Sequence, residues 1–238
     1  MVKSTRQETG FKILGVETSS PVFSVAVAQG ERILSVLKEP GVGRPSVLLM
    51  DLINEASADA GLELSALDGL AVSIGPGSFT GLRVGVMTVK TLAWALKKPV
   101  LPISSLEVTA QNFLDGSPQR ICLFADARKG KVYTAVFSQD GGGGVRRLSE
   151  DRLRLPEEVL KDLTPGTLLV GEGVHRYKDL IASHGPKKFV LTPESRWIPT
   201  AEALCRIAAS RWPSGALDDP HPLVPQYLYS QESDITGW

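Results

Sequence analysis

The first candidate for a chemical role in this 238-residue chain is a glycine-rich turn, because of its residue types and their spacing. It reads GPGSFTG over residues 75–81 and follows the short apolar run LAVSI at residues 70–74. Such turns can bind phosphate where they join a strand to a helix, because their backbone N–H groups are free to donate. The match is incomplete, since the last two glycines are one residue too far apart for the dinucleotide fingerprint and Pro76 has no N–H. A phosphate turn and a tight structural turn both remain open.

Acidic residues at two predicted strand ends are the second candidate. Glu17 ends the buried-strand pattern of residues 13–16 and precedes the hydroxyl-bearing Thr18, whereas Asp126 follows a similar apolar run. A carboxylate in this place can hold a metal-bound phosphate, or it can accept hydrogen bonds from turn N–H groups, which is the commoner role. The residues of a candidate nucleotide or phosphate turn are Glu17, Thr18, Gly75, Gly77, Ser78 and Thr80.

Other catalytic constellations are missing from the sequence. The three histidines, His175, His184 and His221, are scattered without HxxxH or HxxE spacing, so no metal site is predicted. No GxSxG nucleophile elbow is present. The two cysteines, Cys122 and Cys205, lie in apolar runs without CxxC spacing and are typical of buried thiols in a reducing compartment. We therefore assign no catalytic residue.

The turn is positioned by the helix that follows it, which is predicted to begin near Gly81 with Ser78 or Thr80 as its cap. One face of this helix has the spacing of a core face and consists of Leu82, Val86, Val89, Ala93 and Leu96. A second stripe consists of the small residues Gly81, Gly85, Thr88 and Ala95. Each mid-helix glycine costs about 1 kcal/mol relative to alanine, so we expect the close approach of another helix to offset that cost. Burial between two elements of the same chain is the alternative.

The remaining pattern predicts an α/β protein built from two related lobes. A three-strand meander is expected at residues 13–16, 22–28 and 32–38, followed by a helix at 45–60. The run RICLFADARKGKVYTAVF repeats the order strand, acid, turn, strand of ILGVETSSPVFSVAV, which indicates an internal duplication. We predict a flexible tail at residues 1–10, an N-terminal lobe at 11–115, and a smaller C-terminal lobe at 116–238 whose tail packs back.

Composition excludes some classes of function. Lysine plus arginine equal aspartate plus glutamate at 26 each, so the net charge is zero and unaided nucleic-acid binding is not expected. The polar N-terminus lacks the apolar segment of a secretory signal, and no run approaches the roughly twenty apolar residues of a membrane span. We expect a cytoplasmic protein with no membrane association.

Four sequence blocks together resemble the TsaB (YeaZ) family. They are ILGVETSSPVFSVAV, GPGSFTGLRVG, KKPVLPISSLE and DARKGKVY, whose order and spacing match from about Phe11 to Tyr133. The PQYL near the C-terminus also fits the ending of the family. The family belongs to the actin, sugar-kinase and heat-shock ATPase (ASKHA) superfamily, whose members have two duplicated α/β lobes. The resemblance therefore implies the fold class that the internal repeat also indicates.

The resemblance implies a function as well. It indicates a scaffolding and activating subunit of the bacterial complex that transfers a threonylcarbamoyl group to adenosine 37 of ANN-decoding tRNAs. The catalytic paralogue, TsaD, carries an HxxxH metal motif where this chain has Ser105 and Thr109, so the chain is expected to be non-catalytic. No cofactor is expected on the chain itself, because ATP, threonylcarbamoyl-AMP and a metal belong to partner subunits. TsaD is the expected direct partner, and TsaE and tRNA are reached through the complex.

In the family two helices build the contact with TsaD, and they correspond here to residues 45–60 and 81–96. The resemblance thus places the partner interface on Val47, Met50, Asn54, Gly81, Arg83, Gly85 and Thr88. An unpaired apolar surface of this kind also favours a homodimer of the isolated chain. The chain departs from the family by having Pro45 where histidine is usual and Glu17 where aspartate is frequent. The first departure affects how the chain enters the helix at residues 45–60, and the second weakens the transfer of a nucleotide-binding role from the family.

Two other functions stay open on the sequence alone. A stand-alone ASKHA-type ATPase or small-molecule kinase would use Glu17, Asp126 and the turn at residues 75–81. Turnover of Mg-ATP by the isolated chain would favour that function. A peptidase, an activity sometimes proposed for relatives, has no nucleophile–base arrangement in its support.

Overall fold

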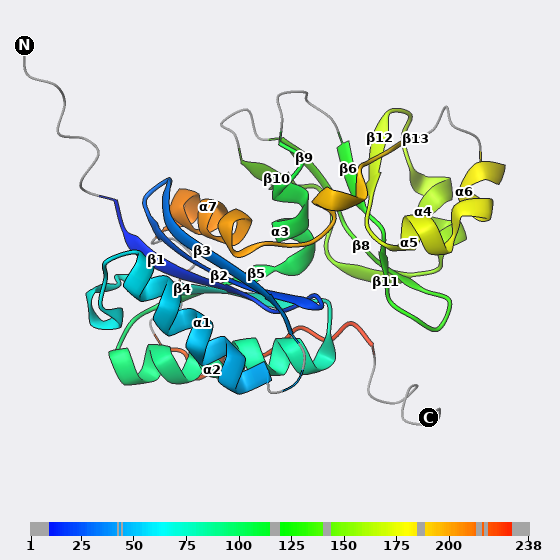
Figure 1. Ribbon diagram of the computed structural model, residues 1–238. Coiled ribbons are helices and arrows are strands. Elements are labelled where there is room, and N and C mark those ends of the chain that lie inside the picture. The colour runs from blue at the N-terminus through cyan, green and yellow to red at the C-terminus, as the bar shows by residue number, and fades with distance from the viewer. Residues whose placement is uncertain are drawn as a thin grey trace, which may run out of the picture. The chain divides into compact units, whose positions relative to one another are not determined.

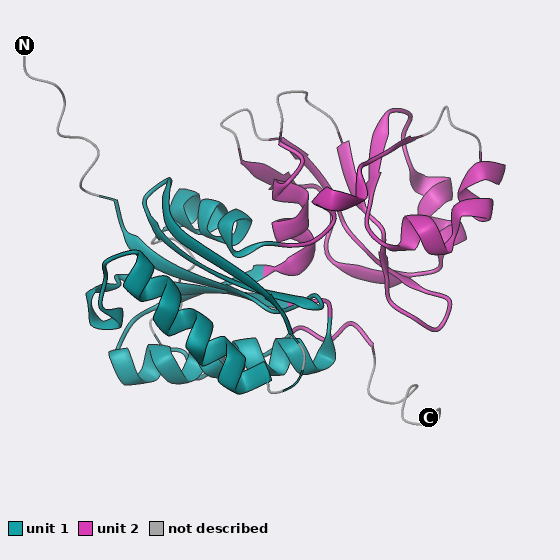
Figure 2. Cartoon of the chain, viewed as in Figure 1, with its two compact units in different colours: residues 1–74, 78–103, 200–225 teal, residues 75–77, 104–199, 226–238 magenta. Residues whose placement is uncertain are grey.

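The structure is a computed structural model that describes residues 10–41, 43, 45–114, 120–139, 144–184, 189–212, 216 and 219–229. The chain forms two compact units, shown in different colours in Figure 2. Unit 1 consists of residues 1–74, 78–103 and 200–225. Unit 2 consists of residues 75–77, 104–199 and 226–238. Because each unit draws on separate stretches of the chain, neither is a simple N-terminal or C-terminal half.

Unit 1 is built on a five-stranded sheet of order β3-β2-β1-β4-β5. The strands are β1 (Lys12–Glu17), β2 (Val22–Gln29), β3 (Arg32–Pro40), β4 (Gly69–Gly75) and β5 (Val100–Ser104). The first three strands form an antiparallel meander, as predicted, and β1 then pairs in parallel with β4. The central strands β1 and β4 are almost entirely buried, which matches their continuous apolar runs.

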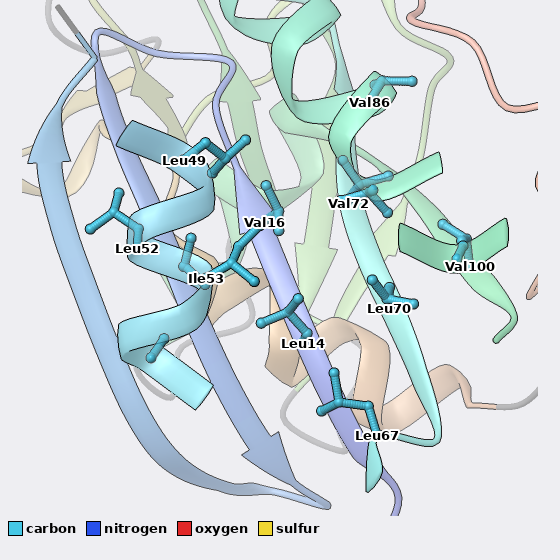
Figure 3. Packing of buried hydrophobic residues seen from close by; sticks show 14 of the residues in the cluster. Leu14, Val16, Leu49, Leu52, Ile53, Leu67, Leu70, Val72, Val86 and Val100 are labelled. Atoms are coloured by element: carbon cyan, nitrogen blue, oxygen red, sulfur yellow. The ribbon is translucent and has the colours of Figure 1, made fainter. Parts of the chain in front are cut away.

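Helices cover both faces of this sheet (Figure 1). The helices α1 (Pro45–Asp59) and α2 (Phe79–Leu96) lie side by side on one face, and α7 (Ala201–Arg211) lies on the other. Between α1 and β4 the chain forms a short 3₁₀ turn, η1 (Leu64–Ala66). Figure 3 shows the main core, in which Leu49, Leu52 and Ile53 of α1 face side chains of β1 and β4 such as Leu14 and Leu70.

Unit 2 contains a second five-stranded sheet of order β10-β9-β6-β12-β13. Its strands are β6 (Arg120–Leu123), β9 (Val136–Gln139), β10 (Val145–Arg147), β12 (Thr167–Val170) and β13 (Phe189–Leu191). A separate three-stranded sheet consists of β7 (Ala125–Asp126), β8 (Val132–Thr134) and β11 (Arg152–Arg154). The helical segments are α3 (Ser105–Gln111), α4 (Pro156–Asp162), α5 (Gly173–Arg176), α6 (Lys178–Ser183) and η2 (Glu194–Arg196).

The two five-stranded sheets share one topology. In each, three antiparallel strands are followed by a strand that pairs in parallel with the first, so that β6, β9, β10 and β12 correspond to β1, β2, β3 and β4. This common order confirms the predicted fold class of duplicated α/β lobes. The copies differ after the first strand, because unit 2 inserts the hairpin β7–β8 before its second sheet strand β9.

The structure divides the chain differently from the predicted lobes. Residues 200–225 belong to unit 1, whereas we had placed them in the C-terminal lobe, and α3 belongs to unit 2 rather than to the N-terminal lobe. The reason for the first difference is steric, because α7 presents the small side chains of Ala201 and Cys205 to Ala26 and Ala28 of β2. Residues 173–183 form two short helices, α5 and α6. Residues 1–9, which belong to the predicted flexible tail, lie outside the described residues.

Candidate functional site

The turn between β1 and β2 is attached to the first turns of α2. Thr18 is fully buried, and its Oγ1 donates a hydrogen bond of 2.8 Å to the carbonyl oxygen of Gly81. The backbone N–H of Ser78 donates to the carbonyl oxygen of Ser19 at 2.7 Å. These two hydrogen bonds hold the turn at residues 17–20 against α2, so the two segments that we predicted as one candidate site are indeed neighbours.

The two glycines of α2 make room for this turn. A Cβ atom built on Gly81 would lie 2.0 Å from the carbonyl oxygen of Thr18, and one built on Gly85 would lie 2.1 Å from Thr18 Oγ1. Both glycines are buried. The prediction that Gly81 and Gly85 face a partner helix is therefore wrong, because the chain's own turn already occupies that space. The alternative of burial between two elements of the same chain is the correct one for these two residues.

Glu17 lies beneath the turn and is completely buried. Its Oε1 accepts a hydrogen bond of 2.6 Å from the backbone N–H of Ser19, whereas its Oε2 and the nearby buried Ser73 Oγ make no hydrogen bond with ideal geometry to the described residues. Burial raises the pKa of Glu17, although interactions with Ser19 and Ser73 oppose the shift. Glu17 thus serves as an acceptor for a turn amide, the commoner of its two predicted roles, and burial favours its neutral form.

The backbone N–H groups at the start of α2 are largely used within the chain. Ser78 caps the helix, since its Oγ accepts from the N–H of Gly81 at 3.2 Å and its carbonyl oxygen accepts from Leu82. The N–H of Ser78 itself is bonded to Ser19. Thr80 is exposed, and Gly75 is buried with a φ of 114°, a conformation that favours glycine, ahead of the half-buried Gly77. This arrangement supports a structural turn and offers few free donors to a phosphate.

Asp126 has a similar role in unit 2. Its Oδ1 accepts from the backbone N–H of Arg128 at 3.0 Å, and its Oδ2 lies 3.3 Å from Nη1 of Arg176. Like Glu17, Asp126 accepts a hydrogen bond from a backbone N–H group of the turn that follows it.

The positions that correspond to the HxxxH metal motif hold structural hydroxyls. Ser105 and Thr109 are both buried. Ser105 Oγ donates to the carbonyl oxygen of Pro76, and Thr109 Oγ1 donates to the carbonyl oxygen of Ser105 at 2.9 Å. In the part of the chain that the structure describes, no three histidine, cysteine, aspartate or glutamate side chains gather into a group that could hold a metal ion.

The outer surface of α1 and α2 carries large exposed apolar side chains. The exposed fractions are 53% for Val47, 55% for Met87 and 76% for Trp94. Phe79 is also exposed, and the guanidinium of Arg83 lies over its ring at 3.8 Å from the centroid. The predicted interface residues other than the two glycines lie toward this outer surface, with Asn54 and Arg83 exposed and Met50 and Thr88 half-buried. Trp94 and Phe79 were not predicted, although their spacing from Met87 and Arg83 in the helix was a usable signal.

A segment of the C-terminal tail borders this surface. Lys90 Nζ donates to the carbonyl oxygens of His221 and Leu223, at 2.5 and 3.2 Å, and the Leu223 side chain is buried in the core of unit 1. An open hollow of about 480 Å³ lies between Met87, Trp94, Pro220 and His221. Residues 219–225 of the tail thus lie beside α2 and extend its apolar surface.

None of the helices in the described ranges combines the length and the apolar composition needed to cross a bilayer.

Comparisons with known proteins agree with the resemblance in the sequence. The family model of TsaD, described as tRNA N6-adenosine threonylcarbamoyltransferase, matches residues 44–192. The tRNA threonylcarbamoyladenosine biosynthesis protein TsaB of Bacillus subtilis (strain 168) is 29% identical over 227 residues, which cover 93% of this chain and 96% of the relative. The protein of the same name in Escherichia coli (strain K12) is 26% identical over 221 residues, which cover 91% and 94%. The solved structure of YeaZ from Pseudomonas aeruginosa superposes with a TM-score of 0.80 at 28% identity, covering 92% of this chain and all of that one.

Proposed function

The chain belongs to the TsaB (YeaZ) branch of the TsaD family, and from this premise we propose that it is a non-catalytic subunit in tRNA threonylcarbamoyladenosine biosynthesis that acts by binding TsaD. The family model covers more than half of the chain, and curated relatives named for this biosynthesis match it over nearly its full length. In the proposal, the assembled complex transfers the threonylcarbamoyl group to adenosine 37 of ANN-decoding tRNAs, and this subunit scaffolds and activates it.

The observation that carries the proposal is the exposed apolar surface on α1 and α2. Val47, Met87 and Trp94 are each more than half exposed, and removing such apolar area from water favours association with a partner. A surface that includes an exposed tryptophan and an exposed methionine has side chains that are enriched in interface cores. The polar Asn54 and Arg83 on the same two helices supply a rim. This surface fits a helical partner that lies across both helices.

The chemistry of the transfer belongs, in this proposal, to TsaD. Ser105 and Thr109 hold hydroxyls where the catalytic paralogue has metal-binding histidines, and both hydroxyls are committed to backbone carbonyls of the chain itself. A buried hydroxyl with a carbonyl partner is a poor replacement for an imidazole ligand. ATP, threonylcarbamoyl-AMP and the metal are therefore assigned to the partner subunits.

The remaining parts of the proposal follow from the same role. TsaE and tRNA join through the complex, and the complex works in the cytoplasm, where tRNA is modified. When TsaD is absent, the apolar surface of α1 and α2 favours pairing of two copies of this chain.

Reconstitution tests the proposal directly. Purified TsaD, TsaE and threonylcarbamoyl-adenylate are combined with tRNA, with and without this chain, and modified adenosine is quantified by mass spectrometry. We expect modification to depend on the chain. Equal modification in its absence would refute the proposed role.

A matched pair of variants tests the surface. Met87→Glu on α2 and Leu191→Glu on β13 replace side chains with similar exposed fractions, 55% and 57%. We expect Met87→Glu to abolish co-elution with TsaD in gel filtration and Leu191→Glu to retain it. An intact complex with Met87→Glu, or equal loss with both variants, would argue against docking on α2.

A further inference from the structure

The hairpin between β7 and β8 presents a dense group of cations on a constrained tip. Arg128, Lys129 and Gly130 all have positive φ, at 65°, 48° and 74°, and Lys131 follows directly. L side chains rarely adopt this conformation, so Arg128 and Lys129 are held there at a conformational cost. The tip is held by hydrogen bonds from Lys131 N to Arg128 O at 3.0 Å and from Ala127 N to Lys131 O at 3.1 Å. Three cationic side chains in four residues thus project from a fixed backbone.

Tyr229 of the C-terminal tail packs against this hairpin. The Tyr229 hydroxyl donates to the carbonyl oxygens of Ala127 and Arg128, at 2.9 and 3.1 Å. The Tyr229 ring meets the Tyr133 ring edge-on at 6.3 Å between centroids, and Lys131 Nζ lies 5.6 Å from the Tyr229 centroid. An aromatic ring and a lysine are therefore held next to one another.

An open groove of about 530 Å³ begins at this place, lined by Lys131, the β11 residues 152–154, Asp151, Leu228 and Tyr229. Its volume is in the usual range for a small-molecule or single-nucleotide site. Strand β11 pairs with β8, so Arg152 and Arg154 lie beside the cationic hairpin within one small sheet. The groove is thus part of unit 2 alone.

The charges that line the groove are unequally compensated. The Asp151 carboxylate is occupied by Arg147 Nη1 at 2.5 Å and by Ser104 Oγ at 2.6 Å. Arg154 is paired with Glu158 and Asp162. Within the described residues, however, neither Lys131 nor Arg152 forms an ion pair with a carboxylate. As far as the described part of the chain extends, the groove therefore has two cations without a carboxylate partner beside the ring of Tyr229.

We propose that this groove binds the phosphodiester backbone of RNA, with Lys131 and Arg152 contacting phosphates and the Tyr229 ring contacting a base or ribose. Cations combined with an aromatic platform are the combination that single-stranded RNA segments require. The inference rests on the proposed function, because tRNA is the substrate of the complex. It agrees with a net charge of zero, since two phosphate contacts position an RNA that the rest of the complex holds.

The test uses the complex with TsaD and full-length tRNA. The variant Lys131→Gln/Arg152→Gln removes both groove cations, and Arg120→Gln/Lys178→Gln removes the same charge from other exposed positions of unit 2. We expect the groove variant to bind tRNA roughly tenfold more weakly at about 0.1 M salt, and to lower the slope of log affinity against log salt by about 2. The control variant keeps affinity and slope. Equal behaviour of the two variants would overturn the proposal.

A second measurement does not depend on TsaD, so its failure is distinct from a failure of the proposed function. RNA that contains 4-thiouridine is photocrosslinked to the full chain alone at low salt and high RNA concentration, so that a contact too weak to hold RNA unaided is still trapped covalently, and the attached peptides are identified by mass spectrometry. We expect crosslinks on peptides that contain Lys131 or Tyr229. Crosslinks found only elsewhere would contradict the proposal. Suppression of the crosslinks by millimolar AMP, with unchanged tRNA affinity of the groove variant, would instead identify a mononucleotide pocket and reject the RNA contact.

Discussion

Thr18 occupies the space that a side chain at Gly85 would need. A Cβ atom on Gly85 would lie 2.1 Å from Thr18 Oγ1, although the two residues belong to a strand turn and to the middle of a helix. The same Oγ1 donates to the carbonyl oxygen of Gly81, one helical turn earlier. The glycines of α2 thus serve the fold of unit 1, and the partner binding that we propose is assigned to the outer surface of α1 and α2.

The first prediction concerns this contact. Gly85→Ala should destabilise the fold, because overpacking of this kind typically costs 1–3 kcal/mol, more than the about 1 kcal/mol that alanine adds to helix propensity. Thr18→Ala removes Oγ1, so the double variant should recover most of the loss. Urea unfolding of the single and double variants measures this coupling.

Gly81→Ala is the matched control for the comparison of Gly85→Ala with and without Thr18→Ala. Its Cβ would meet the backbone carbonyl oxygen of Thr18 at 2.0 Å, which no side-chain substitution removes. We therefore expect Thr18→Ala to rescue Gly85→Ala and not Gly81→Ala. If the effect of Thr18→Ala is simply additive with both glycine substitutions, the turn at Thr18 does not contact Gly81 and Gly85.

A second close contact joins β1 to α7. A Cβ on Gly15 would lie 2.6 Å from Cys205 Sγ, so Gly15→Ala should destabilise unit 1 by roughly 1–3 kcal/mol. Cys205→Ala removes the sulfur and should offset that loss. The second cysteine is the control, because Cys122→Ala lies in unit 2 and should show no coupling to Gly15→Ala. Thermal or urea unfolding of the four variants decides the matter, and equal rescue by both cysteine variants would count against the contact.

A third prediction follows from the raised pKa of Glu17. Because burial raises the pKa of Glu17 in the folded state above its ordinary value of 4.5, the folded protein binds more protons than the unfolded one between these two pKa values. The contribution of Glu17 to the stability of the folded state is therefore fully present below pH 4.5. It is lost as the pH rises through the folded-state pKa. Glu17→Gln keeps an oxygen acceptor for the Ser19 N–H and cannot ionise.

The free energy of unfolding of Glu17→Gln should thus improve relative to that of the parent as the pH rises from 4.5 to 8. Urea unfolding at a series of pH values measures the difference. Glu55→Gln, on the exposed side of α1, is the control and should follow the parent. If the difference in the free energy of unfolding between Glu17→Gln and the parent is constant across the series, the pKa of the Glu17 carboxyl is not shifted.

The fourth prediction concerns the ion pairs of Arg147. Its guanidinium reaches Asp151 at 2.5 Å and Glu107 at 3.4 Å, and both carboxylates are almost fully buried. Arg147→Met removes the cation that these two buried carboxylates share, so we expect a loss of about 3 kcal/mol near pH 7.

Arg154→Met is the counterpart of that variant. Arg154 pairs with Glu158 and Asp162, whose side chains are 50% and 66% exposed, so its removal should cost less than about 1 kcal/mol. Chemical unfolding at pH 7 compares the two. Similar losses for both variants would show that the burial of the Arg147 partners does not matter.

Local signals in the sequence predicted most elements of unit 1. The predicted meander matches β1, β2 and β3, and the helix expected from Gly81 begins two residues earlier, at Phe79. Unit 2 was harder, because its strands have only two to four residues and give little periodicity. The hairpin β7–β8 and its pairing with β11 therefore escaped prediction.

The strand–turn–helix unit, the duplicated topology and the family could be predicted from the residues alone, because these depend on local runs of residues and on the order of motifs. What lies against Gly81 and Gly85 became clear from the fold. A helical glycine indicates a close neighbour, but the neighbour, Thr18, lies 63 residues away from Gly81 along the chain. The structure likewise placed α7 on the first sheet, because the fit of Cys205 over Gly15 is a matter of shape between distant segments, which no local pattern encodes.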